Sequence, residues 1–168
     1  MRIVSLVSAG LLVTGSAWAE VTRHALPNNN PFPIARAVEV TAETALIYHS
    51  GQIPGPKNPK APKGSAEYYG DTEAQTLSVL KKLESSLKDL GVGFEDVIKM
   101  TVFLVGDPAK GGKMDFSGFM KAYTQYFGTE SQPNKPARSA VQIAGLAGGP
   151  NMLVEIEMVI AKPEKDKQ

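Results

Sequence analysis

Two stretches near the C-terminal end of the chain alternate between apolar and other residues with a period of two, which predicts β-strands. They lie within Lys135 to Ala161 and are separated by the Gly-rich residues 144–151, which cannot continue either strand. In the second stretch one predicted face is apolar throughout, and it consists of Met152, Val154, Ile156, Met158 and Ile160. The opposite face carries two carboxylates, those of Glu155 and Glu157, among Leu153, Val159 and Ala161.

Arg138 lies in the first of these strands, on the predicted face that also carries Ala140 and Gln142. A charged side chain in a largely buried strand is costly unless it is paired or faces a cleft. One interpretation is structural: an Arg–Glu ion pair within the chain, or an exposed sheet face with alternating charges. The other is functional, because a guanidinium can grip a carboxylate ligand with two parallel hydrogen bonds.

The N-terminal half contains two further short apolar runs, Ile34 to Val40 and Ala45 to Ser50. Residues 41–44 separate them, so the pattern predicts a β-hairpin. Residues 20–33 are rich in Asn and Pro and have no periodicity, which predicts an irregular surface segment. The prolines of residues 54–70 predict a surface loop.

Leucines and aromatic residues at helical spacing predict two helices. The first begins after the capping residue Asp71, ends at Gly91, and would bury Leu77, Leu80, Leu83, Leu87 and Leu90. The second begins after Asp115, ends at Gly128, and would bury Phe116, Phe119, Tyr123 and Phe127. Between them, Phe94 to Val105 is strongly β-branched and predicts a central strand.

The predicted order of elements is strand, strand, helix, strand, helix, strand, strand. This order indicates an α+β domain in which a mixed β-sheet has two helices packed on one face. The other face of such a sheet stays uncovered within one chain. Because the predicted strand faces mix apolar and charged residues, we expect partial burial of that face between subunits of an oligomer.

The first residues predict a secretory signal peptide over residues 1–19. Arg2 precedes an apolar run from Ile3 to Val13, and Ala17-Trp18-Ala19 supplies a cleavage site with small residues. The run is too short for a spanning helix, although an uncleaved amphipathic anchor is the alternative. Cleavage leaves residues 20–168 as one domain without a membrane span, in a periplasmic or secreted location.

Charge and composition exclude several classes of function. Cleavage removes Arg2 and no acidic residue, so the mature chain has equal numbers of basic and acidic residues. The lysines are scattered and form no basic stripe, which argues against nucleic-acid binding. The absence of cysteine excludes disulfides and thiolate catalysis, and suits an oxidising compartment. With only His24 and His49, a zinc site is not expected, and each histidine is interpreted as a solvated or capped imidazole.

Four segments together resemble one known family. They are SGQIP at 50–54, VIKMTVFL at 97–104, PARSAVQIAGL at 136–146 and VEIEMVIA at 154–161. They stand in the family order and the resemblance covers nearly the whole chain after residue 30, so the sequence is identified as similar to the RidA family, also called YjgF or L-PSP. Members of this family hydrolyse reactive 2-imino acids and their enamine tautomers to 2-keto acids and ammonia.

The resemblance implies a chorismate-mutase-like fold and a homotrimer with small-molecule sites between subunits. It implies that Arg138 binds the substrate carboxylate and that Glu155 positions or deprotonates the attacking water, aided by the backbone carbonyl of Ala140. Ser50 and Gly51 would line the substrate pocket, although Ser50 can also be interpreted as a strand-end hydroxyl that satisfies the backbone. No metal and no organic cofactor are implied.

Three positions differ from the family pattern. Ile34 stands where many members have Tyr, Met120 where they have Asn, and Ala140 where they have Cys. The carboxylate grip is kept, while the rest of the pocket is more apolar, so the reaction class is better defined than the natural substrate. The alternative function is a non-catalytic periplasmic small-ligand-binding or holdase trimer on the same fold, which could keep Arg138 alone.

Overall fold

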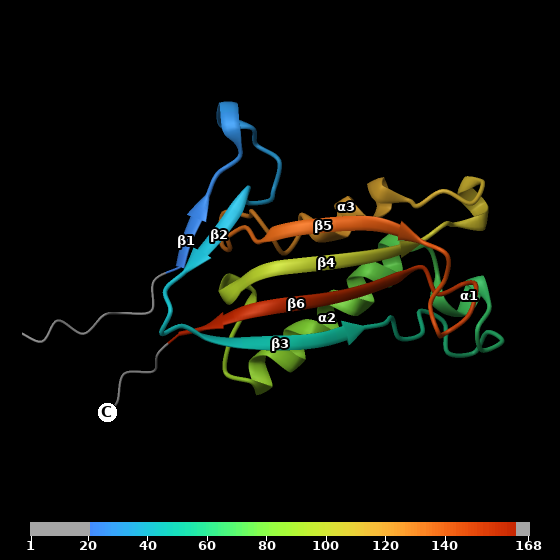
Figure 1. Ribbon diagram of the computed structural model, residues 1–168. Helices are drawn as coiled ribbons and strands as arrows, with labels where there is room; N and C mark the ends of the chain where they lie inside the picture. Colours follow the sequence, from blue (N-terminus) through green and yellow to red (C-terminus); the bar gives the residue numbers. More distant parts are fainter. Residues whose placement is uncertain (1–20, 164–168) are drawn as a thin grey trace, which may run out of the picture.

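The computed structural model describes residues 21–163, and its centre is a four-stranded mixed sheet (Figure 1). The strands lie in the order β3 (Ala45–Gln52), β6 (Val154–Lys162), β4 (Val97–Val105) and β5 (Ala137–Ile143). β6 is antiparallel to both of its neighbours, whereas β5 runs parallel to β4. β3 and β5 are therefore the two edges of the sheet.

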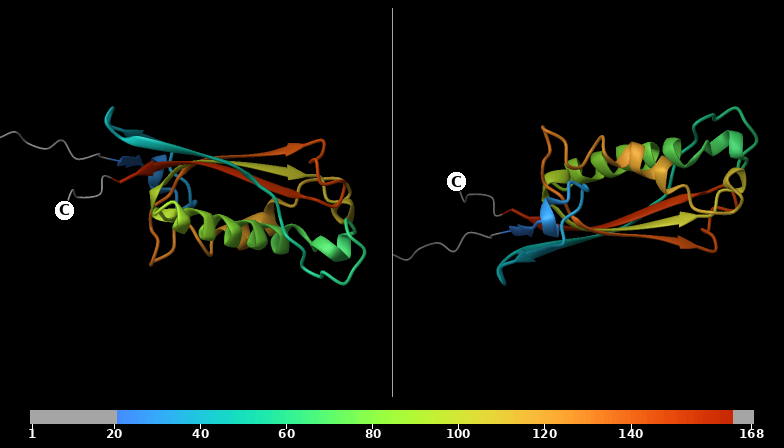
Figure 2. Two further views of the ribbon diagram at one scale, coloured as in Figure 1. Left: turned by 90° about the horizontal axis from the view of Figure 1, so that it is seen from below. Right: turned by 90° about the horizontal axis from the view of Figure 1, so that it is seen from above.

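Two helices, α2 (Thr72–Asp89) and α3 (Phe116–Tyr123), lie on one side of the sheet and leave the other side bare (Figure 2). A third helix, α1 (Ala66–Tyr69), is a single turn that precedes α2. The α+β class and the placement of both long helices on one face are thus confirmed. We call the uncovered side the open face.

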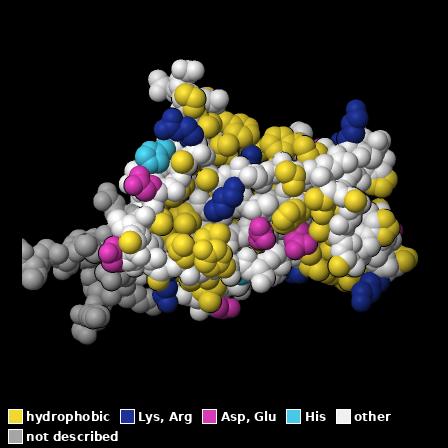
Figure 3. All heavy atoms as spheres, in the orientation of Figure 1, with side chains coloured by type: hydrophobic (Ala, Val, Ile, Leu, Met, Phe, Trp, Pro, Cys, Tyr) yellow, Lys and Arg dark blue, Asp and Glu magenta, His cyan; other side chains and the backbone are white. Residues whose placement is uncertain are grey.

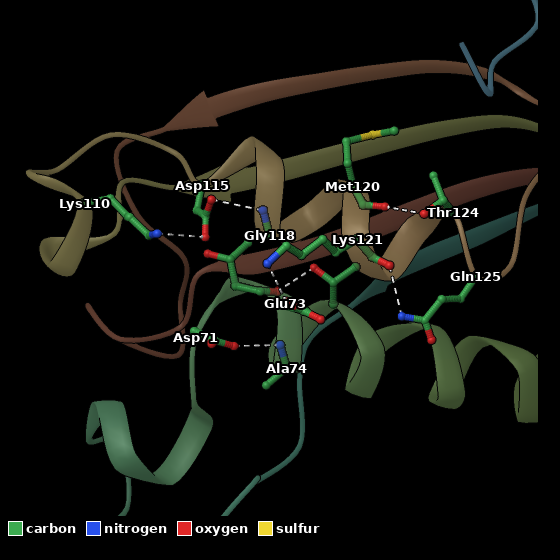
Figure 4. Close-up of polar contacts among 12 residues, drawn as sticks. Asp71, Glu73, Ala74, Lys110, Asp115, Gly118, Met120, Lys121, Thr124 and Gln125 are labelled. Atoms are coloured by element: carbon green, nitrogen blue, oxygen red, sulfur yellow. Dashed lines mark hydrogen bonds and ion pairs between the residues drawn. The ribbon is translucent and has the colours of Figure 1, made fainter. Parts of the chain in front are cut away.

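The two long helices begin at the residues that the sequence predicts. Asp71 accepts a hydrogen bond from the Ala74 amide at 2.9 Å, and Asp115 accepts one from the Gly118 amide at 3.0 Å (Figure 4). Each carboxylate satisfies an amide that the first helical turn would otherwise leave without a partner. An ion pair at 3.6 Å joins Glu73 in the first turn of α2 to Lys121 in the last turn of α3.

The hydrophobic core lies between the helices and the sheet. Burying each large side chain there contributes about 1.5–3 kcal/mol. The apolar face predicted for the last strand is buried as expected, with Val154, Ile156 and Ile160 fully inaccessible. Of the five leucines predicted to be core on α2, three are buried, whereas Leu77 is half-buried and Leu90, at the C-terminal cap, is 42% exposed.

The hairpin predicted from residues 34–50 is wrong. β2 (Ala37–Val40) pairs with β1 (Val21–His24) in a separate two-stranded ribbon, and β3 pairs with β6 instead. The interpretation of residues 20–33 as irregular is wrong for the same reason, since β1 lies in that segment. The four residues Val21–His24 are too few to show a period, and their partner strand comes after the turn η1 (Pro27–Asn29).

Smaller differences concern the ends of elements. The central strand begins at Val97, because residues Phe94–Asp96 form the 3-10 turn η2. The Pro-rich residues 54–70 include α1, and the loop after β4 includes the 3-10 turn η3 (Pro108–Lys110). α3 ends at Tyr123, five residues before Gly128, although Phe127 is still buried.

Within residues 21–163, no helix is both long enough and apolar enough to cross a membrane. The predicted signal peptide lies outside the described residues.

Candidate functional site

Arg138 lies on β5 and points toward the helices. Its neighbours across the sheet are Met100 on β4 and, one strand further, Met158 on β6, and both are buried in the core. Aromatic rings surround the guanidinium: its central carbon is 4.2 Å from the ring centre of Tyr123 and 5.0 Å from that of Phe119, with two further rings at 5.4 and 5.8 Å, those of Phe32 and Phe116. Three of these rings belong to α3, and the fourth, that of Phe32, comes from the loop before β2.

Within the described residues, the Arg138 guanidinium has no ion-pair partner, and its buried Nη1 atom has no hydrogen-bond partner. Burial lowers the pKa of Arg138, while Tyr123 acts in the opposite direction. Burial also raises the pKa of Tyr123 to about 12, and its hydroxyl donates to the Pro33 carbonyl at 2.8 Å. An unsatisfied buried donor costs about 1–3 kcal/mol, so this guanidinium is placed at a cost that a bound anion would offset.

Glu155 lies on the opposite face of the sheet. It pairs with Phe103 on β4, and the register from Met100 to Leu104 is unbroken, so Glu155 projects from the open face while Arg138 projects toward the helices. The interpretation of Arg138 and Glu155 as an ion pair within one chain is therefore excluded. Equally, one chain alone does not bring these two predicted site residues together.

Gly51 lies directly beneath the Glu155 side chain. A Cβ atom added at Gly51 would fall inside contact distance of the Glu155 carboxylate. Gly51 lies within a break in the pairing of β3 with β6, between His49 and Gln52, which is a β-bulge. The absence of a side chain at Gly51 thus lets the carboxylate lie against the backbone of β3.

The open face has a shallow cavity of about 240 Å³ near β3, β4 and β6. Ser50, predicted as a pocket residue, contributes to its lining together with Tyr48, Lys99, Thr101, Glu157 and Val159. The Lys99 ammonium donates to the Ser139 hydroxyl at 3.0 Å. Hydrophobic side chains cover much of this face, with acidic and basic side chains among them (Figure 3). Tyr48 is 77% exposed and Val141 is 43% exposed, which is unusual for large apolar residues on a sheet.

The remaining predicted residues lie near Arg138. Ala140 is two residues further along β5, on the same face and half-buried. Because β5 is an edge strand, its outer side has no partner strand among the described residues. Met120 is half-buried against the core, and the Ile34 amide donates to the Phe32 carbonyl at 2.8 Å.

Sequence reasoning missed the aromatic enclosure of Arg138. The spacing of Phe116, Phe119 and Tyr123 placed them on one helix face, and they were interpreted as core. The helix α3 lies across β5 at Arg138 because β5 pairs in parallel with β4. No local sequence pattern predicts this pairing. Phe32 carried no signal, because it lies in a segment without periodicity.

Both histidines have hydrogen-bond partners within the chain. His24 contacts the Glu39 carboxylate at 3.3 Å, and His49 is hydrogen-bonded at both ring nitrogens. Within residues 21–163 no group of three or more His, Cys, Asp or Glu side chains could hold a metal ion.

The chain is similar to known proteins both in sequence and in fold. The family described as Endoribonuclease L-PSP matches residues 27–162. A protein of Acinetobacter baylyi named 3-aminoacrylate deaminase RutC is 33% identical over 134 residues, which is 80% of this chain and 93% of that protein. The crystal structure of E. coli TdcF with bound serine is 28% identical with a TM-score of 0.53, and covers 77% of this chain and 92% of that chain. A Rid family protein of Yersinia pestis has the same fold, with a TM-score of 0.61, 21% identity, and coverage of 86% and 98%.

Proposed function

The chain belongs to the L-PSP family, also known as YjgF, RidA or RutC, and we propose that it hydrolyses 2-imino acids and their enamine tautomers to 2-keto acids and ammonia. The family includes a protein named as a 3-aminoacrylate deaminase, and an imine or enamine deaminase function is the one that the comparisons support. The substrate class and the roles of individual residues are our proposal.

The unsatisfied Nη1 donor of Arg138 is the observation that carries the proposal. Its Nη1 atom is buried without a hydrogen-bond partner in the described part of the chain, and aromatic rings keep the group partly desolvated. A substrate carboxylate would satisfy this donor and neutralise the charge in a low-dielectric setting, where a charge-assisted pair is strong. A 2-imino acid carries that carboxylate next to its reactive carbon, so binding at Arg138 fixes where the C=N bond lies.

The chemistry needs little beyond this orientation. Water adds to the C=N carbon and gives a tetrahedral carbinolamine, which then expels ammonia and leaves the 2-keto acid. We assign to Glu155 the uptake of the proton that the water loses and its return to the departing nitrogen, with the Ala140 carbonyl as a further acceptor. The iminium carbon is already electrophilic, so positioning of the water is the main contribution.

The two faces of the sheet impose a composite site. Since Arg138 and Glu155 project from opposite faces of one chain, a site that uses both must take Arg138 from one subunit and Glu155 from another. We propose a homotrimer in which the open face of one subunit, with Glu155, Ser50 and Gly51, covers the β5 edge of the next. This arrangement would also bury the exposed Tyr48 and Val141 side chains.

We further propose that the protein is exported. The pattern of residues 1–19 supports a cleaved signal peptide, so residues 20–168 would act in the periplasm or outside the cell. A member of the family in that compartment would meet imines formed there by oxidation of amines or amino acids. The absence of cysteine fits such an environment.

The direct test is ammonia release from 2-iminobutanoate generated in the assay by an amino-acid oxidase. We expect the wild type to accelerate hydrolysis. We expect Arg138→Lys to keep little of this activity, because lysine keeps the charge but loses the paired donors. Arg36→Lys is the matched control, since Arg36 is an exposed arginine outside the proposed site. Wild-type protein that fails to accelerate hydrolysis of any short imino acid would contradict the proposal.

A non-catalytic binding trimer remains the second candidate, because the unsatisfied Arg138 donor would serve a bound carboxylate equally well. Glu155→Gln separates the two functions. In an enzyme this change lowers kcat more than it weakens substrate binding. In a protein that only binds carboxylates, it changes the binding affinity or has no measurable effect.

A further inference from the structure

The imidazole of His49 connects the bulge of β3 to helix α2. Its Nδ1 atom lies 2.8 Å from the Ser50 carbonyl oxygen, and its Nε2 atom lies 2.8 Å from the Ser86 hydroxyl oxygen. His49 pairs with Met158 in the sheet, so its side chain projects to the helix side, toward α2. Both ring nitrogens are thus engaged, at the residue where regular pairing of β3 with β6 stops.

The partners define the tautomer of the ring. A carbonyl oxygen can only accept a hydrogen bond, so Nδ1 must carry the proton that is donated to Ser50. In the neutral ring Nε2 is then the acceptor, and the Ser86 hydroxyl donates to it. If the ring gains a second proton, Nε2 donates to the Ser86 oxygen instead. The connection between β3 and α2 therefore exists in both charge states of His49.

The bulge that this connection holds carries Gly51, whose backbone lies against the Glu155 carboxylate. Residues 50 and 51 are outside the regular ladder, so the pairing with β6 does not fix their position. The His49 ring reaches the Ser50 carbonyl directly, and Ser86 holds the ring from α2, a capped helix of 18 residues with one face packed on the core. The rigid helix is in this way coupled to the surface on which Glu155 rests.

We propose that His49 and Ser86 are positioning residues that fix the Ser50–Gly51 backbone and, through it, the orientation of the Glu155 carboxylate. This inference rests on the proposed function, since Glu155 is the group assigned to the water. The side chains of His49 and Ser86 meet on the helix side of the sheet, whereas Glu155 projects from the open face. They act by limiting the movement of the Ser50–Gly51 backbone beneath the Glu155 carboxylate. A misplaced base lowers the reaction rate far more than it weakens substrate binding at Arg138.

The test compares Ser86→Ala with Ser85→Ala, an exposed serine one position earlier on α2. We expect Ser86→Ala to lower kcat by about tenfold to a hundredfold while KM changes by less than about threefold, and Ser86→Thr, which keeps the hydroxyl, to restore most of kcat. Ser85→Ala should behave as the wild type does. In NMR spectra, the Gly51 amide and the Glu155 carboxyl resonances should move in Ser86→Ala and stay in place in Ser85→Ala.

The NMR readout separates failure of this inference from failure of the proposed function. If Ser86→Ala lowers the melting temperature but leaves the Gly51 and Glu155 resonances and kcat as they are in Ser85→Ala, the connection is structural only and the inference is overturned. If the wild type has no deaminase activity but the two resonances still move as expected, the proposed function fails while the positioning of Glu155 by His49 and Ser86 stands.

Discussion

At the scale of single residues, Arg138 is a position where function and stability favour different side chains. A structural ion pair would make the residue a stabilising element, and removing it would cost about 3–5 kcal/mol. The structure shows instead a partly desolvated guanidinium whose Nη1 donor is unsatisfied within the described residues. Function and stability therefore make opposite demands on this position.

We accordingly expect Arg138→Met, which keeps an unbranched apolar stem and removes the charge, to abolish turnover without destabilising the protein. The lost contacts with the aromatic rings cost about 0.5–2 kcal/mol, and relief of the unsatisfied donor returns about 1–3 kcal/mol. Chemical denaturation should place the variant within about 1 kcal/mol of the wild type, or above it. A loss of several kcal/mol would show that Arg138 has a structural partner after all.

Gly51 makes the converse case, in which a small change should impair the site and leave the fold intact. A methyl group at this position meets the flexible end of the Glu155 side chain, which can swing toward solvent. Gly51→Ala should therefore lower kcat for imino acids by about tenfold or more, because the carboxylate moves by the width of a methyl group. Differential scanning calorimetry should show a melting temperature close to that of the wild type. Gly145→Ala is the control, since nothing lies within 4 Å of the added Cβ there.

Single residues also mark the limit of what the sequence could predict about the site. The alternation of residues in strands marks Arg138, Glu155 and Glu157 as unusual, whereas the choice of Glu155 and Gly51 as site residues comes from the resemblance to a family. The placement of Arg138 and Glu155 on opposite faces depends on the pairing Met100–Arg138 in one ladder and Phe103–Glu155 in another. Period-two alternation gives faces within each strand, but it does not say which faces of two distant strands coincide.

At the scale of secondary-structure elements, the ribbon of β1 and β2 lies at one end of the main sheet (Figure 1), and the side chain of Arg23 joins it to the rest of the fold. Arg23 on β1 donates to three carbonyl oxygens, those of Glu95 at 2.8 Å, Val97 at 2.9 Å and Lys135 at 3.0 Å. Burial lowers the pKa of Arg23, and the nearby Asp96 carboxylate partly compensates. The ribbon and the main sheet share no strand ladder, so Arg23 and an isolated bridge between Ala35 and Ala137 connect the two.

Replacing Arg23 should loosen this ribbon selectively. Hydrogen bonds from a charged donor are worth about 1.5–3 kcal/mol each, and they are not additive, so we expect Arg23→Met to destabilise the protein by about 2–4 kcal/mol. Amide hydrogen exchange should become faster in β1 and β2 and stay slow in β4 and β6. Arg36→Met, which changes an exposed arginine, should leave both measurements unaltered. Uniform loss of protection across the main sheet would contradict a local role for Arg23.

The elements themselves were predicted with uneven success, for identifiable physical reasons. The helix starts at Asp71 and Asp115 were correct because capping is a local property of the chain. The last strand was correct because its apolar face is buried throughout. The hairpin of residues 34–50 failed because proximity in sequence favoured β2 and β3 as partners, whereas β3 bonds with β6, more than a hundred residues away. Long-range pairing of this kind leaves no local signature.

At the scale of the whole molecule, the open face explains why the chain carries apolar groups where it faces solvent. Tyr48, Leu46 and Val141 are exposed there beside Lys99 and Glu157. The sequence predicts this uncovered face, because it predicts two helices on one side of the sheet. The structure confirms that placement (Figure 2). The same face holds Glu155, and the opposite side of β5 holds Arg138, so an assembly that covers the face can also complete a site.

A mixed assembly tests whether the proposed site crosses a subunit boundary. We expect Arg138→Ala and Glu155→Gln each to be inactive alone, because each leaves every site without one essential group. When the two variants are co-expressed with different tags and purified as mixed trimers, one boundary should join an intact Arg138 to an intact Glu155. Activity should return to about one third of the wild-type value, since one of three boundaries is complete in either mixed composition. Mixtures of the two pure homotrimers, prepared without exchange of subunits, are the control and should stay inactive. Mixed trimers without activity, at full occupancy and with unchanged melting temperature, would contradict the composite site.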